Sequence, residues 1–143
     1  MKLRAVMDTN VLVSGVLWRG VPFELLRWAE KNNLVIYANL EILAEVHRVL
    51  HHPKFQQYID NQQASPGELF AKIASLCTII QVDRVVKGVC SDADDEKFLS
   101  CALAANVEVL VSGDKHLFNL LQYQSVRILN AREFYQENIH KVT

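Results

Sequence analysis

The chain is poor in cysteine, proline and glycine. It contains three cysteines, three prolines and five glycines in 143 residues. Cys77, Cys90 and Cys101 are odd in number, lie far apart and form no C-x-x-C pair. This pattern argues against a disulfide framework or a cysteine zinc site, and it is typical of a cytoplasmic protein with reduced thiols.

An excess of charge of one sign is also missing. Lys and Arg total 15 against 16 for Asp and Glu, which gives a net charge of -1. This balance excludes an obviously basic nucleic-acid module, although it allows a local basic rim. The first apolar run is cut at Asp8, and no later stretch approaches the roughly 18 apolar residues of a membrane span. We therefore expect no membrane segment and a cytoplasmic location.

What is present is an ordinary globular composition, with 50% hydrophobic and 22% charged residues. A chain of this length fits one domain, which we assign to residues 1–143. Short apolar runs alternate with longer helical patterns, and a loop is expected around Thr9 and Asn10. We expect strands at 3–7, 34–37, 78–82, 107–111 and 126–129, and helices at 23–31, 40–50, 55–60, 68–76, 94–105, 115–121 and 131–137.

Continuous apolar strands separated by helices predict an α/β fold with a parallel sheet covered on both faces. In such sheets, ligands bind beyond the carboxyl ends of the strands. Asp8 directly follows the first strand, and Asp114 follows the strand at 107–111 after two residues. We therefore expect both carboxylates at the carboxyl edge of the sheet.

Two further acids have unusual positions on helices. Phe98, Leu99 and Ala102 stand three, four and seven residues after Asp95, so Asp95 heads the apolar face of its helix. Glu45 lies at the margin of the apolar stripe of its own helix. A carboxylate that points inward is costly unless it is hydrogen-bonded, paired or bound to a metal.

Each acid also has an ordinary structural interpretation. An acid after a strand often caps the next helix, and an acid in a first turn suits the helix dipole. Taken singly, Asp8, Asp95 and Asp114 fit a cap as well as a site, and Glu45 fits a solvated rim. Their convergence on one edge of the sheet favours a site.

A cluster of carboxylates requires cations. Two of them ~4 Å apart repel by ~4 kcal/mol at an effective dielectric near 20. Hard oxygen ligands without a nearby set of His or Cys select Mg²⁺ or Mn²⁺ over Zn²⁺. Such metals serve phosphoryl transfer by lowering the pKa of a bound water and by stabilising the leaving oxygen.

The same residues resemble the motifs of the PIN-domain family of ribonucleases, and the closest subgroup is formed by bacterial PIN toxins of toxin–antitoxin systems. The ordered set of motifs spans almost the whole chain. It comprises Asp8-Thr9-Asn10-Val11-Leu12-Val13-Ser14, Leu43-Ala44-Glu45-Val46, Asp92-Ala93-Asp94-Asp95-Glu96-Lys97-Phe98-Leu99, and Val109-Leu110-Val111-Ser112-Gly113-Asp114-Lys115-His116-Leu117.

The resemblance implies a Rossmann-like three-layer α/β/α sandwich with a central, mostly parallel sheet. It also implies an endoribonuclease that depends on Mg²⁺ or Mn²⁺ and acts as the toxin of a type II toxin–antitoxin pair. The partners implied are RNA, an antitoxin protein and a second copy of the chain. The residues themselves offer apolar surface candidates for a homodimer around Trp18 and Trp28.

The resemblance also implies roles for single residues. The four metal-binding, catalytic acids correspond by position to Asp8, Glu45, Asp95 and Asp114. Asn10 and Ser112 correspond to polar neighbours that brace the site. Asp94 competes with Asp95 for the third acidic position, and the helical-face argument favours Asp95.

Two further groups have open interpretations. Trp18, Arg19 and Gly20 fit a stacking ring with a phosphate contact for single-stranded RNA, and they fit a loop anchor or subunit contact equally well. Lys115 and His116 directly follow Asp114, so they suit either a contact to substrate phosphate or a solvated surface.

Two other functions compete with the ribonuclease. An aspartyl phosphotransferase or receiver-like domain also uses a strand-end Asp with Mg²⁺, but the Asp8-x-Asn10 pattern lacks the second acid of a D-x-D site. A non-catalytic module that binds RNA or a partner protein would keep the fold without needing the four acids.

Overall fold

A six-stranded sheet in the order β3-β2-β1-β4-β6-β5 forms the centre of the computed structural model, which describes residues 2–142. Neighbouring strands are parallel except for the β5–β6 pair, which is antiparallel. This confirms the predicted α/β class. The strands are β1 (Leu3–Met7), β2 (Leu34–Ala38), β3 (Cys77–Ile79), β4 (Val109–Val111), β5 (Gln122–Tyr123) and β6 (Val126–Leu129).

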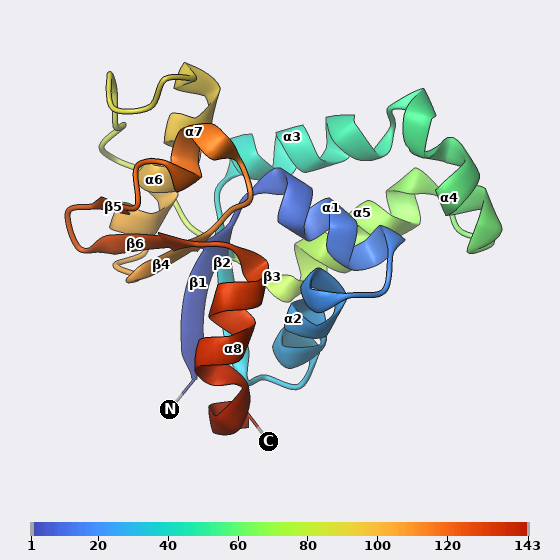
Figure 1. Cartoon of the computed structure of the whole chain (residues 1–143). Helices are drawn as coiled ribbons and strands as arrows, with labels where there is room; N and C mark the ends of the chain where they lie inside the picture. Colours follow the sequence, from blue (N-terminus) through green and yellow to red (C-terminus); the bar gives the residue numbers. More distant parts are fainter. Residues whose placement is uncertain (1, 143) are drawn as a thin grey trace.

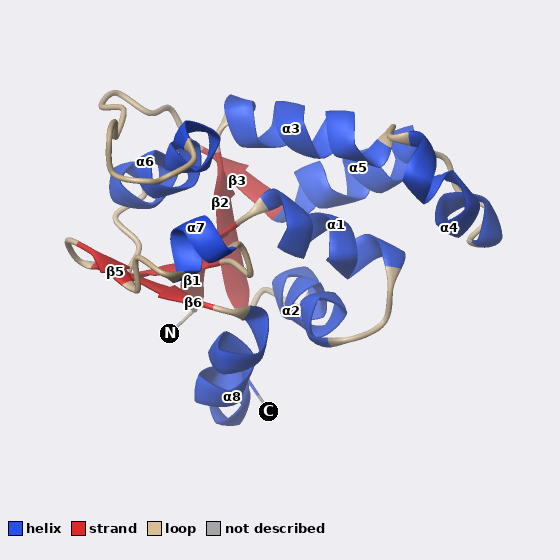
Figure 2. Ribbon diagram, turned by 45° about the horizontal axis from the view of Figure 1, so that its top comes forward, coloured by secondary structure: helices blue, strands red, loops and turns tan. Residues whose placement is uncertain are grey.

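Helices cover both faces of the sheet (Figures 1 and 2). They are α1 (Thr9–Leu17), α2 (Val21–Glu30), α3 (Leu40–Leu50), α4 (Gln56–Asn61), α5 (Pro66–Leu76), α6 (Glu96–Ala104), α7 (Lys115–Phe118) and α8 (Ala131–Val142). Two short 3₁₀ turns, η1 (Pro53–Phe55) and η2 (Ala93–Asp95), precede α4 and α6. Within residues 2–142, every helix is too short or too polar to cross a lipid bilayer.

The order of the strands determines where a site can form. The chain builds β2 and β3 on one side of β1, and then crosses over to build β4, β6 and β5 on the other side. Because parallel crossovers are right-handed, the helix that precedes β4 lies on the opposite face from the helices between β1 and β2. Accordingly, α6 packs on β1, β2 and β4 from one face, while α2 packs on β2 from the other. The switch in direction falls between β1 and β4, where open α/β sheets bind ligands.

The start of α1 differs from the prediction of a loop around Thr9 and Asn10. The helix begins at Thr9, directly after β1, because the Asp8 carboxylate accepts a hydrogen bond from the Val11 amide and caps the first turn. Asp8 is therefore a helix cap and also a strand-end residue. The predicted cap at Asn39 is confirmed, since its side chain accepts a hydrogen bond from the Ile42 amide at the start of α3.

The boundaries in the second half of the chain also differ in places. The strand expected at 78–82 ends at Ile79, and α7 ends at Phe118 rather than at residue 121. Strand β5 was not expected at all. It is enabled by Leu121 and Gln124, which flank it with positive φ angles of 62° and 51° and are not glycines.

Trp28 corrects the prediction of an apolar surface for dimer formation. Its side chain is only 6% exposed, and its ring stacks on Tyr135 of α8 with centroids 5.1 Å apart. Phe134 lies on the same ring at 6.4 Å. Trp28 therefore joins α2 to α8 inside the fold, whereas Trp18 at the end of α1 is 42% exposed.

Candidate active site at the carboxyl edge of the sheet

The ends of β1 and β4 are joined through the Asp8 carboxylate. The Asp8 amide donates to the Val111 carbonyl at 3.0 Å, which continues the pairing of the two strands. One carboxylate oxygen of Asp8 caps α1, and the other accepts a hydrogen bond from the fully buried Ser112 hydroxyl. Asp8 itself is 4% exposed, and the two hydrogen bonds from Val11 and Ser112 determine the direction of its carboxylate.

Asp114 is positioned by the same serine. The Ser112 hydroxyl oxygen accepts a hydrogen bond from the Asp114 amide at 3.0 Å. Asp114 Oδ1 in turn accepts from the His116 amide at 2.8 Å and caps α7. For both Asp8 and Asp114, capping and a place at the edge of the sheet are compatible, because capping occupies only one of the two carboxylate oxygens.

Asp95 enters the site from η2 and points inward. It is 8% exposed, and its Oδ2 is a buried oxygen without a hydrogen-bond partner among the described residues. Such an oxygen costs free energy unless a cation or a donor reaches it. The neighbouring Asp94 is exposed, and its amide donates to the Asp92 carboxylate at 3.0 Å. The structure therefore turns Asp95 toward the interior and Asp94 toward solvent.

The charge of Asp114 acts on the pKa values of two buried aspartates, Asp95 and Asp8. The pKa of Asp95 is raised to about 6, first by burial and then by the negative charges of Asp114 and Asp92, while His116 and Lys97 act in the opposite direction. Burial also raises the pKa of Asp8, against the hydrogen bonds from Ser112 and Val11, and Asp114 contributes there too. Asp114 therefore lies close enough to both buried carboxylates to raise the pKa of each.

Glu45 reaches the edge of the site from α3 and is already paired with a cation. The Thr9 hydroxyl donates to Oε1, and the Lys97 ammonium lies 2.9 Å from Oε2. Lys97 also donates to the Asp94 carbonyl at 2.7 Å, while Arg48 stays more distant from Glu45, at 3.8 Å. Lys97 therefore neutralises Glu45 and links α3 to the turn that carries Asp95.

The chemistry of these side chains fits a divalent metal ion, but their oxygens are not gathered around one point in the structure. Carboxylate oxygens are the ligands that Mg²⁺ and Mn²⁺ prefer, and the unpartnered Oδ2 of Asp95 is an oxygen that a cation would satisfy. Within residues 2–142, however, no group of three or more His, Cys, Asp and Glu side chains stands ready to hold one ion. The Ser112 hydroxyl on Asp8 and the Lys97 ammonium on Glu45 occupy oxygens that an ion would otherwise use.

The remaining predicted site residues are Lys115, His116, Asn10 and Arg19. Lys115 and His116 are exposed beside Asp114, and the His116 ring lies 2.5 Å from the Ser91 hydroxyl. Asn10, in the first turn of α1, is exposed. Arg19 lies beyond the far end of α1, where its guanidinium is 4.8 Å from the Phe23 ring centroid.

Three residues in this region were missed from the sequence. Thr9 and Lys97 hold Glu45, and their pairing spans 36 and 52 positions of the chain, so no local pattern indicates it. Glu96 is 6% exposed and accepts hydrogen bonds from the Val89 and Cys90 amides at 2.5 and 3.1 Å, which keeps its pKa low. Glu96 thereby fixes the loop that leads into η2 and Asp95.

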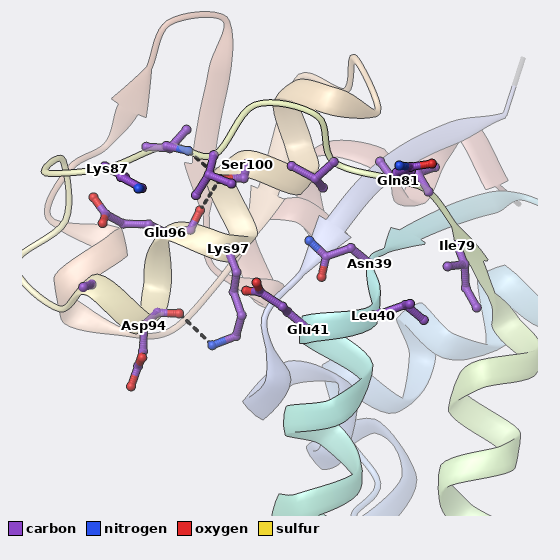
Figure 3. Close-up of a pocket in the computed structure, with 15 residues that line it drawn as sticks. Asn39, Leu40, Glu41, Ile79, Gln81, Lys87, Asp94, Glu96, Lys97 and Ser100 are labelled. Atoms are coloured by element: carbon purple, nitrogen blue, oxygen red, sulfur yellow. Dashed lines mark hydrogen bonds between the residues drawn. The ribbon is translucent and has the colours of Figure 1, made fainter.

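A pocket of about 890 Å³ adjoins this edge of the sheet without including the four predicted acids. It lies between the start of α3, the segment after β3 and the first turn of α6. Lys97 extends along it toward the Asp94 carbonyl, as Figure 3 shows. Leu40, Ile79 and Val85 are exposed apolar residues in its lining.

Comparison with known proteins supports the fold. Three solved structures are similar, each at 15–16% identity: VapBC2 from Rickettsia felis bound to a promoter DNA fragment, FitAcB from Neisseria gonorrhoeae, and the T. brucei RRP44 PIN domain. Their TM-scores are 0.60, 0.52 and 0.51, and the matches cover 90%, 90% and 99% of this chain and 98%, 98% and 83% of theirs. No curated protein sequence matches. The family model of the PIN domain matches residues 4–116, and the chain therefore belongs to the PIN-domain family.

Proposed function

We propose that this chain is an endoribonuclease that uses Mg²⁺ or Mn²⁺ held by Asp8, Asp95 and Asp114, with Glu45 as the fourth acid. The observation that carries the proposal is the buried Oδ2 of Asp95, which lacks a hydrogen-bond partner within residues 2–142 and lies in the field of Asp114. A carboxylate group of this kind is balanced by a hard cation. Membership of the PIN-domain family supports nuclease chemistry at the level of the family.

The chain's own residues would prepare the site in three ways. Ser112 orients Asp8 and Asp114 at once, because its hydroxyl group contacts both. Glu96 holds the loop before η2, so that Asp95 stays turned inward. Lys115 and His116 are exposed beside Asp114 and can contact substrate phosphate. A bound divalent ion supplies the lowered pKa of an attacking water and charge stabilisation at the scissile phosphate.

Glu45 differs from the other three acids because it is already paired with the Lys97 ammonium. To act as a metal ligand, it would exchange the Lys97 ammonium for the ion, since both positive charges would compete for Oε2. The Thr9 hydroxyl could keep its bond to Oε1 during such an exchange. Lys97 would then be free to contact the RNA backbone.

Cleavage of single-stranded RNA by the purified protein tests the proposal. We expect product with Mn²⁺ or Mg²⁺ and none with EDTA. Asp8→Asn and Asp114→Asn should lose most of the activity, whereas Asp94→Asn, at an exposed neighbouring carboxylate, should keep it. Equal cleavage by Asp8→Asn, Asp114→Asn and the unaltered protein would refute the assignment.

We further propose that the chain is a cytoplasmic toxin with a cognate antitoxin protein, and that it assembles as a homodimer. The motif resemblance to bacterial PIN toxins and the structural similarity to VapBC2 and FitAcB support this proposal. The apolar pocket lined by Leu40, Ile79 and Val85 offers a surface of the kind that a partner protein covers. Expression should arrest bacterial growth, co-expression of the neighbouring gene should relieve the arrest, and Asp8→Asn should abolish it.

A non-catalytic binding module remains the alternative, because the Glu45–Lys97 pair neutralises one of the four acids. A module of this type would bind RNA or protein without metal-dependent turnover. A phosphotransferase is less consistent with the site, since the second position of a D-x-D site is Asn10, which is not an acid.

A further inference from the structure

An exposed group of aromatic rings lies at the far end of α1 from the acids. Trp18 is 42% exposed and Tyr58 is 46% exposed, although both are large side chains that a protein usually buries. Phe55 lies against Trp18, with ring centroids 6.0 Å apart, and Tyr58 lies 5.3 Å from it in the same edge-on manner. We call Trp18, Phe55 and Tyr58 the aromatic surface.

The aromatic surface is held in place by its surroundings. The Gln62 side chain donates hydrogen bonds to the carbonyls of Val16 and Leu17, at 3.1 and 3.3 Å. These bonds tie the end of α4 to the last turn of α1. Rings that are ordered before binding lose less conformational entropy when a ligand stacks on them.

The charged residues near these rings in the sequence are mainly basic. The Lys54 ammonium lies 5.0 Å from the Phe55 ring centroid, and Arg19 directly follows Trp18. The sequence from residue 9 to 23 and from residue 46 to 59 contains no Asp or Glu, while the second stretch contains Arg48, Lys54 and three histidines. Asp60, the nearest acid on α4, stands two residues after Tyr58, about 200° around the helix.

Two helices connect the aromatic surface to the acids. Helix α1 begins at the Asp8 cap and ends at Trp18, and helix α3 carries Glu45 and leads into η1 with Phe55. They pack side by side and lead toward α4, as Figure 1 shows. At 1.5 Å per residue, the nine steps from Thr9 to Trp18 span about 14 Å. A short single strand of nucleic acid can cover this distance.

We propose that the aromatic surface, with Arg19 and Lys54, binds single-stranded RNA at a second contact outside the acidic site. Flat rings accept the bases by stacking, and the cations meet the backbone phosphates without sequence preference. Paired bases cannot reach the rings in this way, so the contact selects unpaired RNA. The identity of the ligand as RNA rests on the proposed function. The new element is a second RNA contact, distant from the phosphate that is cleaved.

Binding can be measured separately from cleavage. The probe is a fluorescently labelled single-stranded RNA of roughly 12 nucleotides, within the range of site sizes of such proteins, and the buffer contains EDTA. We expect Trp18→Ala to weaken binding by about 5- to 100-fold. Lys54→Gln should weaken it less and should reduce the slope of affinity against salt by about 0.7 for one lost phosphate contact.

Two controls separate this contact from a general loss of structure. Leu121→Ala removes an apolar side chain that is 64% exposed beside β5, and it should leave RNA affinity unchanged. Trp18→Phe keeps a stacking ring and should recover most of the affinity lost in Trp18→Ala. If Trp18→Ala fails to fold, Lys54→Gln and Tyr58→Ala provide the same comparison.

The result that overturns the proposal is equal RNA affinity in the unaltered protein, Trp18→Ala and Lys54→Gln. A change from dimer to monomer in Trp18→Ala, seen by light scattering together with unchanged RNA affinity, would also overturn it and would assign the rings to a subunit interface. Failure of the nuclease assignment is distinguishable, because loss of cleavage in Asp8→Asn is read with metal, whereas this affinity is read without it.

Discussion

The buried Ser112 hydroxyl donates a hydrogen bond to the Asp8 carboxylate across 104 positions of the chain. This bond joins the carboxyl ends of β1 and β4, where the direction of chain progression reverses. Because the same oxygen accepts from the Asp114 amide, one serine orients two of the proposed metal-binding acids.

Replacing Ser112 with Ala should destabilise the metal-free protein by about 1–3 kcal/mol, the usual cost of leaving a buried acceptor without its donor. Ser75→Ala provides the control, because its hydroxyl is exposed and donates to the Lys72 carbonyl within α5. Urea unfolding of both variants measures the difference. Equal stability of the two variants would mean that the Asp8–Ser112 bond contributes nothing net.

The Asp95 carboxyl should make the metal-free fold less stable as pH rises. Its pKa is about 6 in the fold, against 3.8 for an ordinary Asp, so the fold favours the protonated form. The stabilising contribution is complete below about pH 4 and is lost as pH rises through about 6. Asp8, whose pKa is also raised, acts in the same direction.

Asp95→Asn should therefore melt higher than the unaltered protein in EDTA at about pH 7.5, and close to it at about pH 4. Asp94→Asn, at an exposed carboxylate one position earlier, should change little at either pH. Melting curves for the three proteins test this expectation. An Asp95→Asn variant that melts lower at the higher pH would show that the carboxylate stabilises the fold in its charged form.

Removing the positive charge of Lys97 should lower the free energy of unfolding, because the Glu45 carboxylate loses its ion-pair partner. Lys97→Gln leaves a carboxylate that is only 21% exposed without its ammonium partner, which should cost about 1–3 kcal/mol in the absence of metal. Arg48→Gln should cost less than about 1 kcal/mol, because Arg48 is 72% exposed and lies 3.8 Å from Glu45.

Added Mn²⁺ should reduce the deficit of Lys97→Gln, since an ion at Glu45 would replace the lost positive charge. Thermal melting with and without Mn²⁺ measures this. A deficit of the same size in both conditions would mean that Lys97 and the ion do not compete for Glu45.

Gly15 is required where α1 packs on α2. A Cβ at this position would lie 2.5 Å from Leu26 Cδ1 and 3.1 Å from the Pro22 carbonyl oxygen. Leu26 is 2% exposed and cannot move away freely, so Gly15→Ala should destabilise by about 1–3 kcal/mol despite the better helix propensity of Ala. Gly67→Ala in α5, whose Cβ would have its nearest neighbour at 3.9 Å, should be neutral or stabilising in the same unfolding experiment.

The sequence predicted those features that depend on local patterns. The apolar runs of β1, β2 and β6 indicated strands, and the spacing of Phe98, Leu99 and Ala102 placed Asp95 on the inner face of its helix, where the structure has it buried. The parallel order then followed from the alternation of strands and helices. These predictions needed only side-chain periodicity.

Other features depend on contacts that no local pattern encodes. Trp28 was expected at the surface because its helix gives no sign of Tyr135, more than 100 positions later, on which it stacks. The pairing of Glu45 with Lys97 also depends on how α3 meets α6.

Calorimetric titration of the purified protein with Mn²⁺ tests the central claim, that the acids at the edge of the sheet hold a divalent ion. We expect the unaltered protein and Asp94→Asn to bind Mn²⁺ with equal affinity, and Asp95→Asn to bind it at least about tenfold more weakly, a loss of about 1.4 kcal/mol. Equal affinity in Asp94→Asn and Asp95→Asn, or no binding to the unaltered protein, would contradict the account.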